Sequence, residues 1–206
     1  RGWACCKVVT TDRGLTQVMS RSTRRRPTIL YRADGYTPVG LGHVVHAVRL
    51  AESLRGRDIA DVRIIGRFDE ATKFWLGGIV VGELLNLSDE ATEPEMLLEE
   101  VERLGAAAVA INLPGELLET AGPLMDALRS SHIPQIHFDN PMAEVAKADL
   151  AINALPHPDW GVDLDGMSQV HEGLEYFMLS ADMVDAAPDS RVRSGAVDRR
   201  LSLIDG

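Results

Sequence analysis

From Thr28 onwards, short apolar runs of strand length alternate with longer stretches of helical period, and this alternation limits the possible folds more than any other feature. Alternating strands and helices are typical of βαβ units around a mostly parallel sheet. The pattern predicts strands over residues 28–33, 61–66, 107–112, 134–138 and 149–153, and helices over residues 43–55, 93–104 and 116–130. We therefore expect an α/β protein with a Rossmann-like parallel sheet.

Size and composition agree with one globular domain or one lobe of a two-lobed protein. The chain has 206 residues, of which 45% are hydrophobic and 25% charged, so extensive disorder does not describe the whole chain. Apolar runs such as residues 74–82 are well short of the roughly 18 residues that a membrane-spanning helix needs. The two cysteines, Cys5 and Cys6, are adjacent, which argues against a secreted disulfide scaffold and against a CxxC zinc site. A cytoplasmic location is expected.

The net charge of -10 is unevenly distributed along the chain. Residues 1–26 hold seven basic residues and one acidic residue, and the rest holds 14 basic and 30 acidic residues. The acidic excess argues against nucleic acid as a partner of the main domain, because Lys and Arg carry phosphate binding. Residues 1–27 are expected to be a basic, disordered linker or tail, and residues 28–190 the folded lobe, with a loop over 156–169. A charged connector is expected at 191–200, and the start of a new strand at 201–206.

The most informative segment is residues 31–46, where a strand runs into a glycine-containing loop and then into a helix that begins near His43. Gly40 and Gly42 would let a ligand approach the backbone, and the helix N-terminus offers free N–H groups to an anion. The spacing is neither GxGxxG nor that of a Walker loop, which disfavours dinucleotide binding. A histidine in the first turn of a helix is kept neutral by the helix dipole. His43 is thus a candidate general base, or a capping residue with no catalytic role.

Other polar residues at strand ends have both a functional and a structural interpretation. Arg32 and Asp34 would contact a substrate hydroxyl and position the loop, or would form an ion pair at the strand end. His46 lies one turn after His43, but no third metal ligand is evident, so no metal is expected. No other cofactor is expected either. Asp139 either faces the cleft or belongs to an Asp-Asn-Pro turn, and Asn153 would donate a hydrogen bond to a sugar or close a turn.

Five short segments, taken in order, resemble the amino-terminal half of the nucleotide-sugar hydrolases of pseudaminic acid biosynthesis. The segments are RADG at 32–35, GLGHV at 40–44, IHFD at 136–139, ADLAIN at 148–153 and GLEYFMLSADM at 173–183. The resemblance covers residues 28–206. It implies the amino-terminal lobe of a two-lobed GT-B fold, shared with MurG-type glycosyltransferases, with the nucleotide site mainly in a missing second lobe. Residues 191–206 are expected to be the connector and the start of that second lobe, because residues 201–206 resemble the beginning of its first strand.

The resemblance also implies a function and its residues. His43 matches the family's catalytic histidine, which activates water, and Arg32, Asp34, Gly40 and Gly42 match its substrate-binding loop; Asp139 and Asn153 are kept as further substrate-binding candidates. The expected activity is release of UDP from a UDP-linked diacetamido-trideoxy sugar in nonulosonic acid or cell-surface polysaccharide biosynthesis. The alternatives are a GT-B glycosyltransferase that uses a nucleotide-sugar donor and a non-catalytic lobe that binds a sugar or a partner chain. The chain departs from the family at residues 112–115, where NLPG replaces an Asp-Ser-Tyr-like motif, and at Asp139-Asn140, where an acidic pair is reduced.

Overall fold

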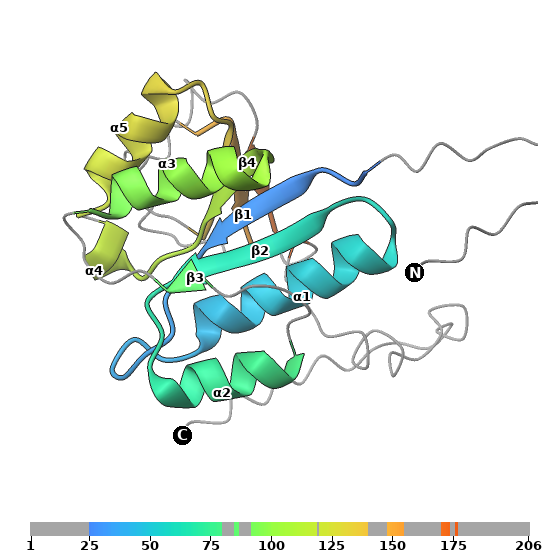
Figure 1. Cartoon of the computed structure of the whole chain (residues 1–206), viewed down its shortest axis with the longest axis vertical. Coiled ribbons are helices and arrows are strands. Elements are labelled where there is room, and N and C mark those ends of the chain that lie inside the picture. Colours follow the sequence, from blue (N-terminus) through green and yellow to red (C-terminus); the bar gives the residue numbers. More distant parts are fainter. Residues whose placement is uncertain are drawn as a thin grey trace, which may run out of the picture.

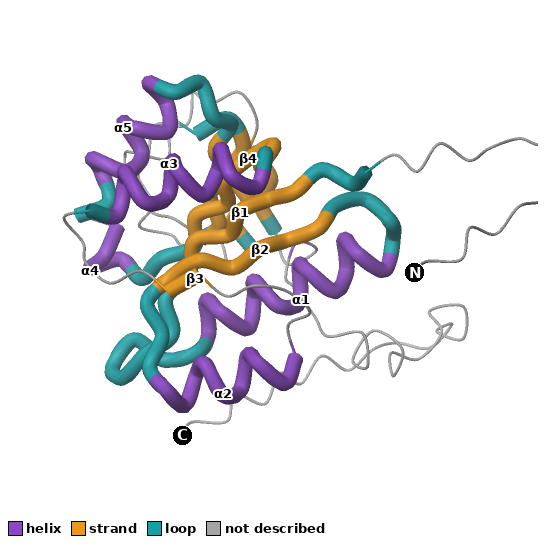
Figure 2. Tube along the Cα trace, in the orientation of Figure 1, coloured by secondary structure: helices purple, strands orange, loops and turns teal. Residues whose placement is uncertain are grey.

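Strands and helices alternate from residue 28 to residue 138, except that two helices follow one another before the strand at residues 135–138 (Figures 1 and 2). A computed structural model describes residues 25–79, 85–86, 92–118, 120–139, 148–154, 170–173 and 176. The strands are β1 (Thr28–Arg32), β2 (Asp61–Gly66), β3 (Leu85–Asn86), β4 (Ala106–Ile111), β5 (Gln135–Phe138), β6 (Leu150–Asn153) and β7 (Val170–Glu172). The helices are α1 (Gly42–Gly56), α2 (Glu70–Ile79), α3 (Glu93–Leu104), α4 (Gly115–Leu118) and α5 (Gly122–Ser130).

The strands form one sheet in the order β3-β2-β1-β4-β5-β6-β7, and every neighbouring pair is parallel. The predicted α/β fold with a Rossmann-like parallel sheet is confirmed. All five predicted strands are present, each within one residue of its expected ends. The chain order reverses between β1 and β4, which makes this pair the topological switch point of the sheet.

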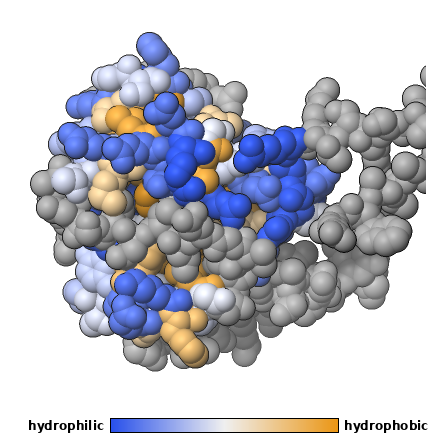
Figure 3. Space-filling view, viewed as in Figure 1, coloured by the Kyte–Doolittle hydropathy of each residue, from blue (hydrophilic) through white to orange (hydrophobic). Residues whose placement is uncertain are grey.

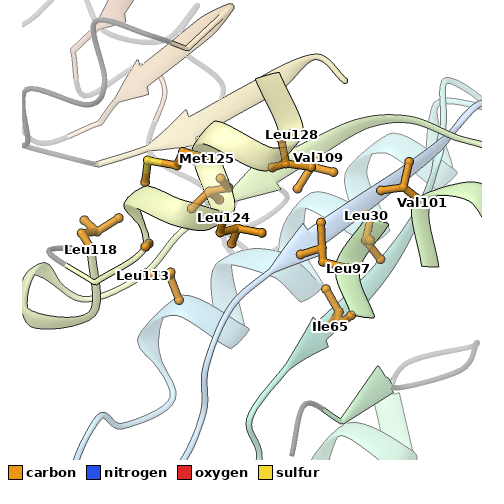
Figure 4. Packing of buried hydrophobic residues seen from close by; sticks show 12 residues of the cluster. Leu30, Ile65, Leu97, Val101, Val109, Leu113, Leu118, Leu124, Met125 and Leu128 are labelled. Carbon is orange, nitrogen blue, oxygen red and sulfur yellow. The ribbon is translucent and has the colours of Figure 1, made fainter. Parts of the chain in front are cut away.

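Helices cover both faces of the sheet, with α1 and α2 on one side and α3 and α5 on the other (Figure 1). On the α3/α5 side, leucines, a valine and a methionine from α3 and α5 pack over β1, β2 and β4 (Figure 4). On the α1/α2 side, Val44, Ala47 and Val48 of α1 pack on the sheet. Because successive residues of a strand point to opposite faces, two neighbouring residues at a strand end contact the helices on opposite sides of the sheet.

The helix predicted over residues 116–130 is wrong as a single element. The structure contains two helices, α4 and α5, and the second begins with Gly122 and Pro123. Proline has no backbone N–H, and its ring clashes with the carbonyl four residues earlier, so it fits the first turn of a helix and not the interior. Three elements were not predicted, namely α2, β3 and β7.

Several sequence-based predictions lie outside the described residues. They are the basic tail up to residue 24, the loop over 156–169, Asn140, the connector at 191–200 and the strand at 201–206. Within the described part of the chain, no helix has the length and apolar character needed to cross a membrane. In Figure 3, hydrophilic residues predominate on the described part of the visible face, and smaller apolar areas lie between them.

Candidate functional site

The candidate site lies where the carboxyl ends of β1 and β4 meet at the switch point. In open α/β sheets this crevice is the usual ligand-binding position, because the connections after the two strands leave in opposite directions. The loop over residues 33–41 follows β1 and leads into α1, and residues 112–114 follow β4. The backbone N–H of Asn112 donates to the carbonyl of Arg32 at 3.0 Å, so the ladder between the two strands continues to Asn112.

The glycine loop is a tight turn that leaves space at its surface. Gly40 has a φ of 81° and donates its N–H to the carbonyl of Tyr36 at 2.9 Å. This left-handed conformation favours glycine. A Cβ atom added at Gly40 or at Gly42 would meet nothing within 4 Å. Both positions therefore have the space that the predicted close approach of a ligand would need.

His43 lies in the first turn of α1, as the sequence predicts, and is half-buried. Its Nδ1 atom is 2.7 Å from Oδ1 of Asn112. The N-cap residue, Leu41, makes no side-chain capping hydrogen bond, and the first turn contains no acidic residue. The N-terminal N–H groups of α1 thus keep their partial positive charge beside His43.

Asn112 connects His43 to two further side chains. Its Nδ2 atom donates to the hydroxyl of Tyr31 at 3.0 Å and lies 3.4 Å from Nδ1 of His46. Tyr31 is completely buried and stacks on Phe138, with 5.6 Å between the ring centroids. A single amide therefore joins β1, β4 and two residues of α1.

Asp139 acts on the same group of side chains through its charge. Burial, together with the nearby carboxylate of Asp139, raises the pKa of Tyr31, although the hydrogen bond from Asn112 opposes the rise. Burial also lowers the pKa of His46, and Asp139 opposes this shift, whereas His43 contributes to it. The His43 cluster is defined here as Tyr31, His43, His46, Asn112 and Asp139.

Asp139 also has a structural task at the edge of the sheet. Its Oδ1 atom accepts a hydrogen bond from the N–H of Ala154 at 2.8 Å, and its own N–H donates to the carbonyl of Ile152 at 3.0 Å. The residue has a φ of 45°, a left-handed conformation that aspartate tolerates better than most residues. The predicted turn geometry and the electrostatic role in the His43 cluster are both present.

Arg32 and Asp34 lie on the opposite face of the sheet from His43. Both are completely buried and form an ion pair with each other. Arg32 also donates to Glu93 at the start of α3, with 3.2 Å between Nη2 and Oε2, and Asp34 accepts from the backbone N–H of Arg67 at 2.7 Å. The strand-end ion pair is thus part of a larger charged network, which is formed by Arg32, Asp34, Arg67 and Glu93. Direct contact of Arg32 and Asp34 with a substrate stays a prediction.

The charged network forms part of the wall of a pocket of about 160 Å³. Arg67 and Glu93 supply its charged groups, and the other lining residues are Pro94, Leu113, Leu117, Thr120, Ala121, Pro123 and Leu124. It lies between α3, α4 and α5, beyond the carboxyl end of β4. A small, mostly apolar group with one polar atom would suit this lining.

Asn153 is not brought together with His43. It ends β6, which β4 and β5 separate from β1, and at the usual spacing of parallel strands this places the two strands about 14 Å apart. Its Nδ2 atom is 3.2 Å from Oε1 of Glu172, and its buried Oδ1 has no hydrogen-bond partner among the described residues. Binding of substrate by Asn153 stays a prediction.

In the sequence, His46 stands out only as half of a possible metal-binding pair with His43. In the described ranges, no group of three or more His, Cys, Asp or Glu side chains could hold a metal ion. The 3.4 Å contact with Asn112 instead makes His46 part of the hydrogen-bonded cluster.

His137 lies in the same sequence cluster as Asp139 but is a core residue. It is 1% exposed, and burial, with a smaller contribution from the positive charge of Arg129, lowers its pKa to about 4. The unfolded chain would bind a proton at the ordinary pKa of about 6.5. Between these two values the unfolded state binds more protons than the folded state, so the free energy of unfolding falls as the pH is lowered.

We expect His137→Gln to remove this pH dependence. The wild-type free energy of unfolding should fall by roughly 3 kcal/mol between pH 6.5 and pH 4 through this one group, and the variant should lack that contribution. Urea unfolding across this range measures the slope for both proteins. His132→Gln, at an exposed histidine, serves as the control and should keep the wild-type slope. If the free energy of unfolding depended on pH equally in the wild type and in His137→Gln, the prediction would be contradicted.

Tyr31, Asn112 and the pair Arg67–Glu93 were missed as components of the site. The signal for Asn112 was available, because it is the last residue of a predicted strand and is two residues after Ala110, which packs on the α1 side. Strand alternation also places Tyr31 on the α1 side and its neighbour Arg32 on the α3 side of the sheet. Glu93 carried no such signal, since its contact with Arg32 spans 61 positions of the sequence.

Comparisons with known proteins returned no match: no protein-family model, no curated protein and no solved structure is similar enough to this chain to support an assignment.

Proposed function

We propose that this protein is a nucleotide-sugar hydrolase that releases UDP from a UDP-linked diacetamido-trideoxy sugar. The observation that carries the proposal is the position of His43, which lies in the first turn of α1, at the switch point, with Nδ1 at 2.7 Å from Asn112. With Nδ1 engaged, the other ring nitrogen, Nε2, is free to accept a proton. The resemblance of residues 28–206 to the amino-terminal lobe of such hydrolases supports the same assignment.

In the proposed reaction, His43 Nε2 accepts a proton from a water molecule that attacks the substrate, and UDP leaves with the electron pair of the broken bond. A positioned base of this kind contributes typically 10²–10⁴-fold to a rate. The free N–H groups at the start of α1 favour the negative charge of the departing diphosphate. The open surface at Gly40 and Gly42 gives the sugar access to His43.

The resemblance extends the proposal beyond the described lobe. A GT-B enzyme holds its nucleotide mainly in a second lobe, and we propose that such a lobe, in the same chain or in a partner, completes the cleft. The substrate would be a small cytoplasmic nucleotide sugar. The reaction would serve nonulosonic acid or cell-surface polysaccharide biosynthesis.

The test is UDP release by the protein purified from its native host, which ensures its natural length. The purified protein is incubated with UDP-linked diacetamido-trideoxy sugar in water labelled with oxygen-18, with and without added sugar acceptors. Hydrolysis yields UDP and free sugar in equal amounts, with the label in one of the two products. A sugar transferred to an acceptor, without label, would instead establish a glycosyltransferase. Tight binding of the substrate without turnover would establish a non-catalytic lobe.

We expect Gly42→Leu to raise KM for the nucleotide sugar by roughly 10-fold, since crowding a close contact typically costs about 1–3 kcal/mol. Position 42 is exposed and has room for a Cβ atom, so the fold should not change. The matched control is Gly56→Leu at the other end of the same helix, which is equally open and exposed. Steady-state kinetics of UDP release compare the two variants. The same KM in both would mean that the substrate does not approach Gly42.

A further inference from the structure

The His43 cluster contains a device that selects one tautomer of the His43 ring. A neutral imidazole carries its proton on Nδ1 or on Nε2, and the hydrogen bond at one nitrogen decides the state of the other. Oδ1 of Asn112 is an acceptor only, and it lies 2.7 Å from Nδ1 of His43. This contact requires the proton on Nδ1 and leaves a lone pair on Nε2.

The orientation of the Asn112 amide is supported by its other contacts. Its Nδ2 group has two hydrogens, one for the Tyr31 hydroxyl at 3.0 Å and one directed towards His46 Nδ1 at 3.4 Å. The negative charge of Asp139 acts on the Tyr31 hydroxyl. The Tyr31 hydroxyl accepts the amide hydrogen through an oxygen lone pair. Oδ1 of Asn112 then faces His43.

The amide is also held rigidly in space. Asn112 is 2% exposed, and its backbone N–H completes the ladder between β1 and β4. Tyr31 is fixed by burial and by its stacking on Phe138. The acceptor that faces His43 is therefore fixed directly at the carboxyl end of β4, by burial and by a backbone hydrogen bond to β1.

We propose that Asn112 is a positioning residue that holds His43 in its Nδ1–H tautomer, and that Tyr31 sets the orientation of the Asn112 amide. The proposal rests on the proposed function in one respect, namely that Nε2 is the base. In this arrangement the amide substitutes for the carboxylate that orients a catalytic histidine in the Ser-His-Asp triad. A neutral partner has a distinct consequence, because it fixes the tautomer without adding a charge that would favour the imidazolium.

The direct test is the tautomer of His43, read from long-range ¹H–¹⁵N correlations of the ring at a pH where the ring is neutral. We expect the Nδ1–H pattern in the wild type and a shift towards the Nε2–H pattern in Asn112→Leu, which has no acceptor. Asn112→Asp keeps the acceptor and should keep the Nδ1–H pattern. Tyr31→Phe, which removes the hydroxyl and keeps the stacked ring, should give a mixture of the two.

The control is Gln135→Leu, which also replaces a buried amide by leucine, but at the amino end of β5, where Gln135 donates to the carbonyl of Met125 at 2.9 Å. It should leave the His43 tautomer unchanged even if it lowers stability. An Nε2–H pattern in the wild type would overturn the proposal. So would an unchanged Nδ1–H pattern in Asn112→Leu.

The kinetic readout separates this proposal from the proposed function. Asn112→Leu should lower kcat for UDP release by roughly 10- to 100-fold, less than loss of the base itself, with KM changed about 2-fold or less. If the wild type releases no UDP but the tautomer changes as expected, the proposed function fails and the positioning role stands. If UDP release depends on His43 while the tautomer is independent of Asn112, the positioning role fails and the function stands.

Discussion

Replacement of Arg32 by methionine is expected to lower the free energy of unfolding by about 3–5 kcal/mol, the usual cost of leaving a buried charge without its partner. Arg32 is completely buried between Asp34 and Glu93, and it binds both carboxylates. Burial alone would lower the pKa of Arg32, but the hydrogen bonds that it donates to Glu93 and Asp34 outweigh this effect and raise it, so the residue stays charged. Arg67 is then the one remaining cation of the network. Denaturant unfolding measures the loss.

The matched control is Arg103→Met, which breaks the exposed pair between Arg103 and Glu100, 2.7 Å apart. An exposed pair of this kind contributes about 1 kcal/mol or less. The double variant Arg32→Met/Glu93→Leu removes one charge of each sign and leaves Arg67 paired with Asp34 at 3.2 Å. It should be more stable than Arg32→Met alone. A single variant as stable as Arg103→Met would show that the buried network does not depend on Arg32.

Replacement of His43 by asparagine is expected to lower kcat for UDP release by roughly 10²–10⁴-fold, the usual contribution of a general base. The asparagine amide can still donate to Oδ1 of Asn112 from near the position of Nδ1, but it has no group in place of Nε2. The folded structure should therefore persist, and KM should change little. Steady-state kinetics and thermal unfolding of the same preparation measure both expectations.

His132→Asn is the matched control for His43→Asn. His132 is exposed in the turn after α5, on the amino-end side of β5, and has a φ of 57°, which asparagine tolerates well. Its activity should equal that of the wild type. If His43→Asn retained most of the wild-type kcat, His43 would not be the base, and the binding-lobe alternative would gain support.

The division of the site between two faces was predictable in principle from local sequence. β1 places Tyr31 on the α1 side and Arg32 on the α3 side because successive strand residues alternate. The close succession of Arg32, Asp34 and His43 in sequence nevertheless suggested one common site. The structure separates them, since neighbours along a strand end face different helices.

Partners that are distant in the sequence could not be predicted. Asn112 meets His43 across 69 positions, and Glu93 meets Arg32 across 61. No periodicity relates such pairs, because they depend on which strands are adjacent in the sheet. Gly122 and Pro123 did carry a readable local signal for the break between α4 and α5, since proline fits only the first turn of a helix.

The sequence by itself determined the α/β class, the limits of five strands, and the position of His43 after a strand and a glycine turn, because these depend on periodicity and on residues adjacent in the chain. The tertiary structure alone decided that β4 lies beside β1, and this pairing places the Asn112 amide against His43. The reason is physical: strand order is set by how the helices bury both faces of the sheet, and a hydrogen bond between two strand ends exists only after that order has formed.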